Sequence, residues 1–225
     1  MNKLADMPKL ESPFEREEIP GKGYVCVPKF KREFCWIIQP DKVIATEKFD
    51  GTNVSVYLED GRIKAILNRE NRIDIWKDQA HFYEGIKNAI DEKKFKPNRL
   101  LDGQYFGELI GPKLQGNPYN ITKPLWLPFD WVKENYMYKF YNDWLLENFP
   151  EDKELIDEYV YDKFETLFRD LRSLWFRQKE NGRAKHPEGI VFHNKETGEM
   201  CKLRLDMFGM CKRNSWDKCK DLEVK

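Results

Sequence analysis

The strongest constraint on this chain's fold is a segment of alternating apolar and polar residues, 43–70, interrupted by Asp60 and Gly61. Aspartate followed by glycine favours the two-residue turn of a β-hairpin, because both residues tolerate a positive φ. We therefore predict two antiparallel strands, one on each side of this dipeptide.

Two other parts of the chain have the periodicity of amphipathic helices. From Trp76 to Lys94, apolar residues recur every three or four positions, which predicts one helix with a solvent-facing polar side. The same spacing between Glu151 and Lys179 predicts either one long helix or two short ones.

The remaining segments indicate further sheet. Residues 99–111 resemble a strand, 111–124 form a loop rich in Gly, Pro and Asn, and the apolar residues 125–132 predict another strand. Residues 188–194 and 200–208 are short and β-rich, with a turn from Lys195 to Gly198 between them. The segments together predict a globular protein of mixed α and β structure.

Composition agrees with one packed domain. A chain of 225 residues suits a single large domain, and 40% hydrophobic and 14% aromatic residues supply a core despite 35% charged residues. The amino-terminal residues contain no apolar run of a signal peptide, and no stretch is long and apolar enough to span a bilayer. Five cysteines without zinc-site spacing indicate reduced thiols, so we expect a soluble cytoplasmic protein.

The charges exclude a strongly basic protein. Thirty-nine basic residues balance thirty-nine acidic ones, so nucleic-acid binding would need a local patch. Three clusters are candidates, although each alone is typical of a solvated surface. They are Lys22, Lys29, Lys31 and Arg32; Lys93, Lys94 and Lys96; and Lys212, Arg213, Lys218 and Lys220.

The most informative peptide runs from Glu47 to Asn53, with sequence EKFDGTN. Lys48 ends an apolar strand, and Gly51 allows a tight reversal that can hold the amine at the edge of a pocket. A nucleophilic lysine must be neutral, although its reference pKa is about 10.4, so neighbouring cations, a metal or desolvation must favour the free amine. An ordinary strand end followed by a turn is a serious alternative explanation when the peptide is taken alone.

Further motifs follow Lys48 in a fixed order. They are Arg69, Phe106-Gly107-Glu108, Phe129-Asp130, the peptide from Glu188 to Phe192, and Lys202-Leu203-Arg204. Their order and residue types resemble motifs I, Ia, III, IIIa, IV and V of the covalent nucleotidyltransferases, which include DNA ligases, RNA ligases and mRNA capping enzymes. The sequence FGELIGPKLQGNPY, which follows the KFDGTN peptide, is most similar to that of ATP-dependent RNA ligases of phage and viral type.

The resemblance implies a role for each motif residue. Lys48 would attack the α-phosphate of ATP to form lysyl-AMP, and Lys202 and Arg204, on one face of a strand, would contact that phosphate. Glu188 would hold Mg²⁺ or Mn²⁺. The expected nucleotide-binding residues are Glu47, Asn53, Arg69, Glu108, Phe129, Lys202 and Arg204.

Several of these roles have alternatives. Glu108 would accept a hydrogen bond from the ribose, although either motif glutamate could instead form a surface salt bridge. Phe129 would stack on the purine, but an aromatic residue in this segment is often core, and Trp126 or Trp131 could take its place. Arg69 would bind a ribose or the acceptor 5′-phosphate, or it is simply exposed on a hairpin.

The resemblance also implies the fold and the activity. We expect an α+β fold with antiparallel sheets around an ATP cleft and flanking helices, in a domain of residues 1–210 that includes an extension of about 1–40. A basic tail, 211–225, would follow, leaving no room for an OB-fold domain. The predicted function is ATP-dependent joining of RNA 5′-phosphate and 3′-hydroxyl ends by a monomer.

Three other functions remain open at this point. The chain could be a minimal ligase for DNA or RNA/DNA hybrids, or a GTP-dependent guanylyltransferase of the capping type. It could also be a nucleotide- or nucleic-acid-binding module without turnover. Labelling with ATP and with GTP separates the guanylyltransferase and the binding module from an ATP-dependent ligase.

Overall fold

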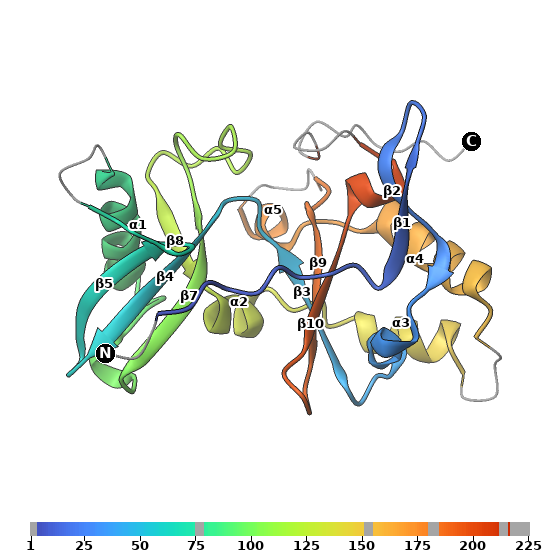
Figure 1. Ribbon diagram of the computed structural model, residues 1–225, viewed down its shortest axis with the longest axis horizontal. Helices are drawn as coiled ribbons and strands as arrows, with labels where there is room; N and C mark the ends of the chain where they lie inside the picture. The colour runs from blue at the N-terminus through green and yellow to red at the C-terminus, as the bar shows by residue number, and fades with distance from the viewer. Residues whose placement is uncertain (1–3, 75–78, 151–154, 180–184, 212–215, 217–225) are drawn as a thin grey trace. The chain divides into compact units, whose positions relative to one another are not determined.

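The computed structural model describes residues 4–74, 79–150, 155–179, 185–211 and 216 (Figure 1). The chain divides into two compact units, which are described separately. Unit 1 comprises Met1–Lys9 and Phe49–Asn135, and unit 2 comprises Leu10–Lys48 and Tyr136–Lys225. Both units combine antiparallel sheet with helices, which confirms the α+β class. The domain bounds 1–210 and 211–225 stay a prediction, and most of the basic tail lies outside the described residues.

Unit 1 is built on a five-stranded sheet with strand order β6-β5-β4-β7-β8. Its strands are β4 (Thr52–Glu59), β5 (Arg62–Asn68), β6 (Asn71–Arg72), β7 (Gly103–Ile110) and β8 (Leu125–Pro128). Helices α1 (Ala80–Asp91) and α2 (Phe129–Asn135) pack against β7 and β8 (Figure 1). A 3₁₀ turn, η2 (Pro97–Arg99), precedes β7.

The predicted hairpin at Asp60 and Gly61 is confirmed. These residues have φ values of 54° and 66°, and Glu59 of β4 pairs with Arg62 of β5 across the turn. Two positive φ angles in succession match the turn that follows the right-handed twist of paired strands. Residues 43–48, however, form the separate strand β3 (Val43–Lys48), which belongs to the sheet of unit 2.

Two predicted boundaries in unit 1 differ from the structure. Helix α1 ends at Asp91 rather than Lys94, and its predicted start at Trp76 lies outside the described residues. Strand β7 begins at Gly103 rather than at residue 99. Before it, the Asp102 carboxylate accepts a hydrogen bond from the Asp60 N–H, and Leu100 and Leu101 are exposed.

The predicted strand 125–132 is wrong beyond Pro128. Proline has no N–H to donate, and it lies at the end of the edge strand β8, where it ends the pairing. Helix α2 then begins at Phe129, with Asp130 in its first turn.

Unit 2 contains a two-stranded sheet and a three-stranded sheet. Strands β1 (Phe14–Ile19) and β2 (Gly23–Phe30) form a hairpin that sequence periodicity did not predict. The other sheet has the order β10-β9-β3, with β9 at Gly189–Asn194 and β10 at Met200–Arg204. The predicted strand 200–208 ends at Arg204, where a 3₁₀ helix, η3 (Leu205–Phe208), begins.

The helical region of unit 2 is divided among several helices. Of the two predicted alternatives for 151–179, the structure has two short helices, α4 (Asp157–Asp170) and α5 (Leu174–Lys179). Helix α3 (Tyr141–Asn148) and the 3₁₀ helix η1 (Arg32–Ile38) were not predicted. Helix α4 packs along β2 (Figure 1).

Aromatic rings form the core around η3. Phe208 lies with its ring centroid 5.0 Å from that of Phe168, 5.5 Å from Tyr161 and 6.4 Å from Phe14. Burying a phenylalanine contributes about 2 kcal/mol, so this cluster fixes the position of η3.

The described residues contain no OB-fold domain beside these sheets and helices. Within the same part of the chain, no helix is long and apolar enough to cross a membrane.

Candidate functional site

The three-stranded sheet of unit 2 presents its basic residues on one face. Lys48 of β3 pairs with Gly189 of β9, which in turn pairs with Arg204 of β10. One row further, Val191 pairs with Lys202. Directly paired residues, and residues two apart on a strand, share a face, so Lys48, Lys202 and Arg204 emerge on the same side. The alternating residues Glu47, Ile190 and Leu203 are buried on the other face.

Gly189 lies between Lys48 and Arg204 and cannot be larger. A Cβ at this position would lie 2.1 Å from the Leu203 carbonyl oxygen and 2.8 Å from the Arg204 Cα. Both are backbone atoms of β10, so they cannot move without disturbing the strand pairing. The glycine therefore lets the strands approach and leaves no side chain between the two cations.

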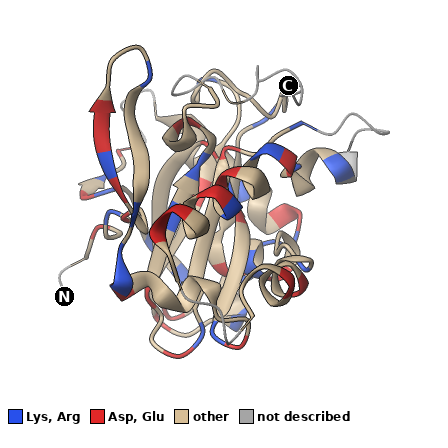
Figure 2. Cartoon of the chain, turned by 90° about the vertical axis from the view of Figure 1, so that its right-hand side faces the viewer, with Lys and Arg blue, Asp and Glu red and all other residues tan. Residues whose placement is uncertain are grey.

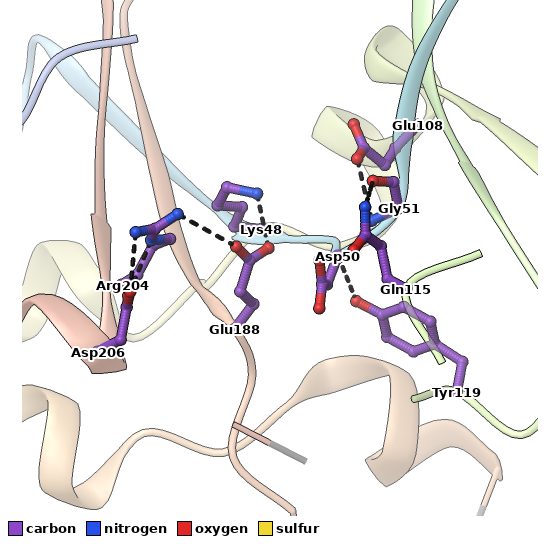
Figure 3. A network of polar contacts seen from close by, with 9 residues as sticks. All are labelled: Lys48, Asp50, Gly51, Glu108, Gln115, Tyr119, Glu188, Arg204 and Asp206. Atoms are coloured by element: carbon purple, nitrogen blue, oxygen red, sulfur yellow. Dashed lines mark hydrogen bonds and ion pairs between the residues drawn. The ribbon is translucent and has the colours of Figure 1, made fainter. Parts of the chain in front are cut away.

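A chain of alternating charges crosses this face (Figure 3). Lys48 Nζ lies 2.6 Å from Glu188 Oε2, and Arg204 Nη1 lies 4.0 Å from Glu188 Oε1. Arg204 in turn donates from Nε and Nη2 to the two oxygens of Asp206, both at 2.8 Å. These side chains are mostly buried, so loss of any one would leave a poorly solvated charge.

Glu188 fits the predicted role of metal ligand only with help from a substrate. Among the described residues, no group of three or more His, Cys, Asp and Glu side chains could hold a metal ion. Magnesium commonly binds through one or two carboxylates together with substrate phosphates and water. The role of Glu188 as a metal ligand therefore stays a prediction, in which nucleotide phosphates would supply further oxygen ligands.

Glu47 lies on the opposite face of β3 and anchors the start of α5. Its carboxylate accepts hydrogen bonds from the Ser173 hydroxyl at 2.5 Å, the Leu174 N–H at 2.6 Å and the Trp175 N–H at 3.1 Å. Burial raises the pKa of Glu47 to about 7, although the three donors act in the opposite direction. Its expected contact with the nucleotide stays a prediction.

The raised pKa of Glu47 predicts a pH-dependent stability. A carboxyl group with a higher pKa in the folded state stabilises the fold most below its ordinary value of 4.5. That contribution is lost as the pH rises through about 7. We expect the Tm of the wild-type protein to fall more steeply between about pH 5 and about pH 8 than that of Glu47→Gln, which cannot ionise.

The slope, rather than the absolute Tm, is the measurement that matters in this comparison. Glu196→Gln is a suitable control, because Glu196 is exposed and only pairs with Lys42 at 3.7 Å. Parallel curves for wild-type protein and Glu47→Gln would show that Glu47 does not titrate in this range.

In unit 1, three side chains bind the peptide that follows Lys48 (Figure 3). The Asp50 N–H donates to the Tyr119 hydroxyl at 2.6 Å, and the Gly51 N–H donates to Glu108 Oε1 at 3.0 Å. Gln115 donates from its side-chain amide to the Gly51 carbonyl at 3.3 Å. Sequence reasoning assigned no role to Gln115 or Tyr119, although both lie in the stretch FGELIGPKLQGNPY that carries the family resemblance, because a loop has no periodicity that indicates contacts.

Glu108 and Asn53 are brought together as a directly paired couple on β7 and β4. The Glu108 carboxylate binds the motif backbone at Gly51, while the Asn53 amide donates to Met7 Sδ at 3.3 Å. The ribose contact expected for Glu108 and the pocket role expected for Asn53 stay predictions.

The structure distinguishes Trp126 from the other two aromatic candidates for purine stacking. Trp126 is fully buried, and its indole N–H donates to the Val54 carbonyl at 3.0 Å, so it is a core residue. Phe129, at the start of α2, is half-buried. Trp131 is also half-buried, with Lys94 Nζ 4.7 Å from its ring centroid. The predicted role of Phe129 is therefore retained as a proposal.

Arg69 lies in the turn between β5 and β6, with a φ of 55°. Its side chain is exposed, as the simple hairpin alternative predicts. Its role toward a ribose or 5′-phosphate stays a prediction.

Several cations of the predicted basic clusters form ion pairs with acidic residues. In the first cluster, three cations form ion pairs with nearby acids, and Figure 2 shows the two charge types interspersed on unit 2. These pairs are Lys29–Glu17, Lys31–Glu11 and Arg32–Asp157. Lys94 of the second cluster pairs with Glu92 at 2.7 Å, and the third cluster lies outside the described residues. The first cluster therefore offers little concentrated positive charge.

Comparison with known families covers the part of the chain that contains the motif series. The family model described as RNA ligase matches residues 41–205. The chain belongs to the RNA ligase family. The matched range contains every predicted site residue, from Glu47 to Arg204, and ends one residue before Asp206. The resemblance read from the motifs is thus confirmed at the level of the family.

No curated protein matches the sequence. This chain is similar to solved structures of the Naegleria gruberi RNA ligase. An apo variant is 19% identical, covers 92% of this chain and 59% of that chain, and has a TM-score of 0.48. Two variants with ATP and Mn are 19% and 18% identical, cover 89% and 88% of this chain, and have TM-scores of 0.47 and 0.49. This chain spans 58% and 61% of those two structures.

Proposed function

We propose that this member of the RNA ligase family uses ATP and carries AMP on Lys48 during RNA joining. The observation that carries the proposal is the basic face of the sheet in unit 2. There Lys48, Lys202 and Arg204 emerge together, and Glu188 contacts the lysine at 2.6 Å. Such a face suits a nucleophilic amine acting on a phosphate group.

In the first step, Lys48 Nζ attacks the α-phosphorus of ATP. A nitrogen–phosphorus bond forms, the bond from the α-phosphorus to the bridging oxygen breaks, and pyrophosphate leaves. The attacking amine must be neutral, whereas a carboxylate at 2.6 Å favours the ammonium form. We infer that Glu188 turns away from Lys48 when the nucleotide binds, and that the amine then loses its proton to solvent.

Lys202 and Arg204 would stabilise the reacting phosphate. Their positive charges offset the negative charge on the phosphate oxygens as the new bond forms. The planar guanidinium of Arg204 can donate two parallel hydrogen bonds to such oxygens. A divalent cation, Mg²⁺ or Mn²⁺, held by Glu188 and the phosphates, would supply further neutralising charge.

Further predicted site residues would recognise the nucleoside. Glu108 is proposed to accept a hydrogen bond from the ribose, and Phe129 to stack on the purine. Base stacking on an aromatic ring contributes about 1 to 3 kcal/mol in single-strand binding proteins, so Phe129 would add substantially to affinity. Arg69 and Asn53 are proposed to complete these contacts, and Glu47 to support Lys48 from the opposite face of β3.

Two further transfers would complete the reaction on RNA. AMP moves from Lys48 to a 5′-phosphate, forming a pyrophosphate linkage and releasing the lysine. A 3′-hydroxyl then attacks that 5′-phosphorus, the new phosphodiester forms and AMP leaves. Oligonucleotides of RNA, DNA and their hybrids, each with a 5′-phosphate and a 3′-hydroxyl, would show which polynucleotide is joined.

Incubation with ATP labelled at the α-phosphate tests the proposal directly. In the presence of Mg²⁺ or Mn²⁺, we expect acid-labile label on the denatured protein, and peptide mapping should place it on Lys48. ATP labelled at the γ-phosphate is the matched control and should leave no label, because pyrophosphate is released. Label from GTP alone would indicate a guanylyltransferase, and no label from either nucleotide would leave a binding module.

A further inference from the structure

Asp206 contacts Arg204 more closely than any other charged group described around that arginine. Its two carboxylate oxygens accept hydrogen bonds from Arg204 Nε and Nη2, both at 2.8 Å (Figure 3). This is the two-point geometry in which guanidinium and carboxylate groups interact most strongly. One edge of the guanidinium is therefore committed to Asp206, while Nη1 lies 4.0 Å from Glu188.

We propose that Asp206 is a positioning residue that holds Arg204 away from Glu188 and directs it toward the reacting phosphate. The inference rests on the proposed adenylylation of Lys48. Asp206 itself contacts no reacting atom in this proposal, since it acts through Arg204.

The distances show what Asp206 prevents. Glu188 lies 2.6 Å from Lys48 Nζ and 4.0 Å from Arg204 Nη1, so the contact with Lys48 is the closer of the two. Without Asp206, the most favourable interaction for the Arg204 guanidinium would be a pair of hydrogen bonds from Nε and Nη2 to the Glu188 carboxylate. Arg204 would then leave the phosphate position and compete with Lys48 for the same carboxylate.

The backbone keeps Asp206 in place for this role. The Leu205 N–H donates to the Glu188 carbonyl at 3.1 Å, so η3 is tied to the residue whose side chain faces Lys48. Leu205 and Phe208, on either side of Asp206, are buried in the core of unit 2. Gly209 ends η3 with a φ of 69°, a conformation that glycine adopts without strain.

A double-mutant cycle separates positioning from general stability. We expect Asp206→Asn to lower the single-turnover rate of Lys48 labelling by about 10- to 100-fold, with a smaller change in the KM for ATP. Arg204→Gln should lower the rate at least as far. Because Asp206 acts through Arg204, the double variant should be no slower than Arg204→Gln alone. Multiplicative losses would show that Asp206 acts independently and would overturn the inference.

A matched control and a second readout complete the test. Asp157→Asn removes another arginine–aspartate ion pair of unit 2, to Arg32 at 2.7 Å, and should label at the wild-type rate. In the protein without nucleotide, the NMR signal of the Arg204 Nε–H should shift in Asp206→Asn and largely return in Asp206→Glu. An unchanged signal would contradict the geometry whether or not the protein is labelled.

The outcomes also separate this inference from the proposed function. A wild-type protein that accepts no label from ATP would overturn the proposed adenylylation. A wild-type protein that labels on Lys48, with Asp206→Asn equally fast, would leave that function intact and overturn the role of Asp206.

Discussion

Lys48→Arg is expected to lose covalent labelling from ATP, by about a thousand-fold or more in rate, while the protein stays folded. Guanidinium does not deprotonate near neutral pH, so arginine cannot supply the free amine that attacks phosphorus. It can still pair with Glu188, which Lys48 contacts at 2.6 Å. Loss of labelling without loss of Tm would therefore report the nucleophile rather than the fold.

Two further variants sharpen this measurement. Lys48→Ala should also lose labelling, but it leaves Glu188 without its close cation and should lower Tm. Lys42→Arg, in the exposed ion pair with Glu196, should label as the wild type does. Label retained in Lys48→Arg or Lys48→Ala would show that another residue carries the nucleotide.

Gly189→Ala is expected to cost about 3 kcal/mol of unfolding free energy or more, since the overpacked atoms cannot rearrange locally. The new Cβ would lie 2.1 Å from a carbonyl oxygen of β10, far inside van der Waals contact. Relief requires β9 and β10 to separate at the row that carries Lys48 and Arg204. Urea unfolding would measure the loss of stability, and the rate of Lys48 labelling should fall with it.

Gly198→Ala provides the comparison at the other end of the same hairpin. Gly198 lies in the turn with a φ of 75°, and no atom lies within 4 Å of the added Cβ. The substitution therefore only forces alanine into a left-handed conformation, which should lower the free energy of unfolding by about 1 to 2 kcal/mol. Equal losses in the two variants would mean that backbone crowding at Gly189 does not limit stability.

The sequence alone determined the family and the order of the site motifs. The peptide around Lys48, followed by Glu108, Glu188 and Arg204, was sufficient to indicate the family. The residue types and their order can be read directly along the chain. The hairpin at Asp60 was also predictable, since a turn of two residues depends on local φ preferences. Spacing also predicted that Lys202 and Arg204 share a face, because alternation along a strand is a local property.

Tertiary structure decided which partners these residues have. Glu47 binds the start of α5 across 126 residues, and Glu188 contacts Lys48 across 140, and no local periodicity encodes such separations. Trp126 lies in the core, which only the packing of the sheet shows. Phe129 begins a helix because Pro128 ends the edge strand β8, and the position of an edge depends on the whole sheet. Asp206 follows Arg204 by only two residues, yet its role depends on Glu188 lying on the far side of the guanidinium, and strand pairing brings that carboxylate there.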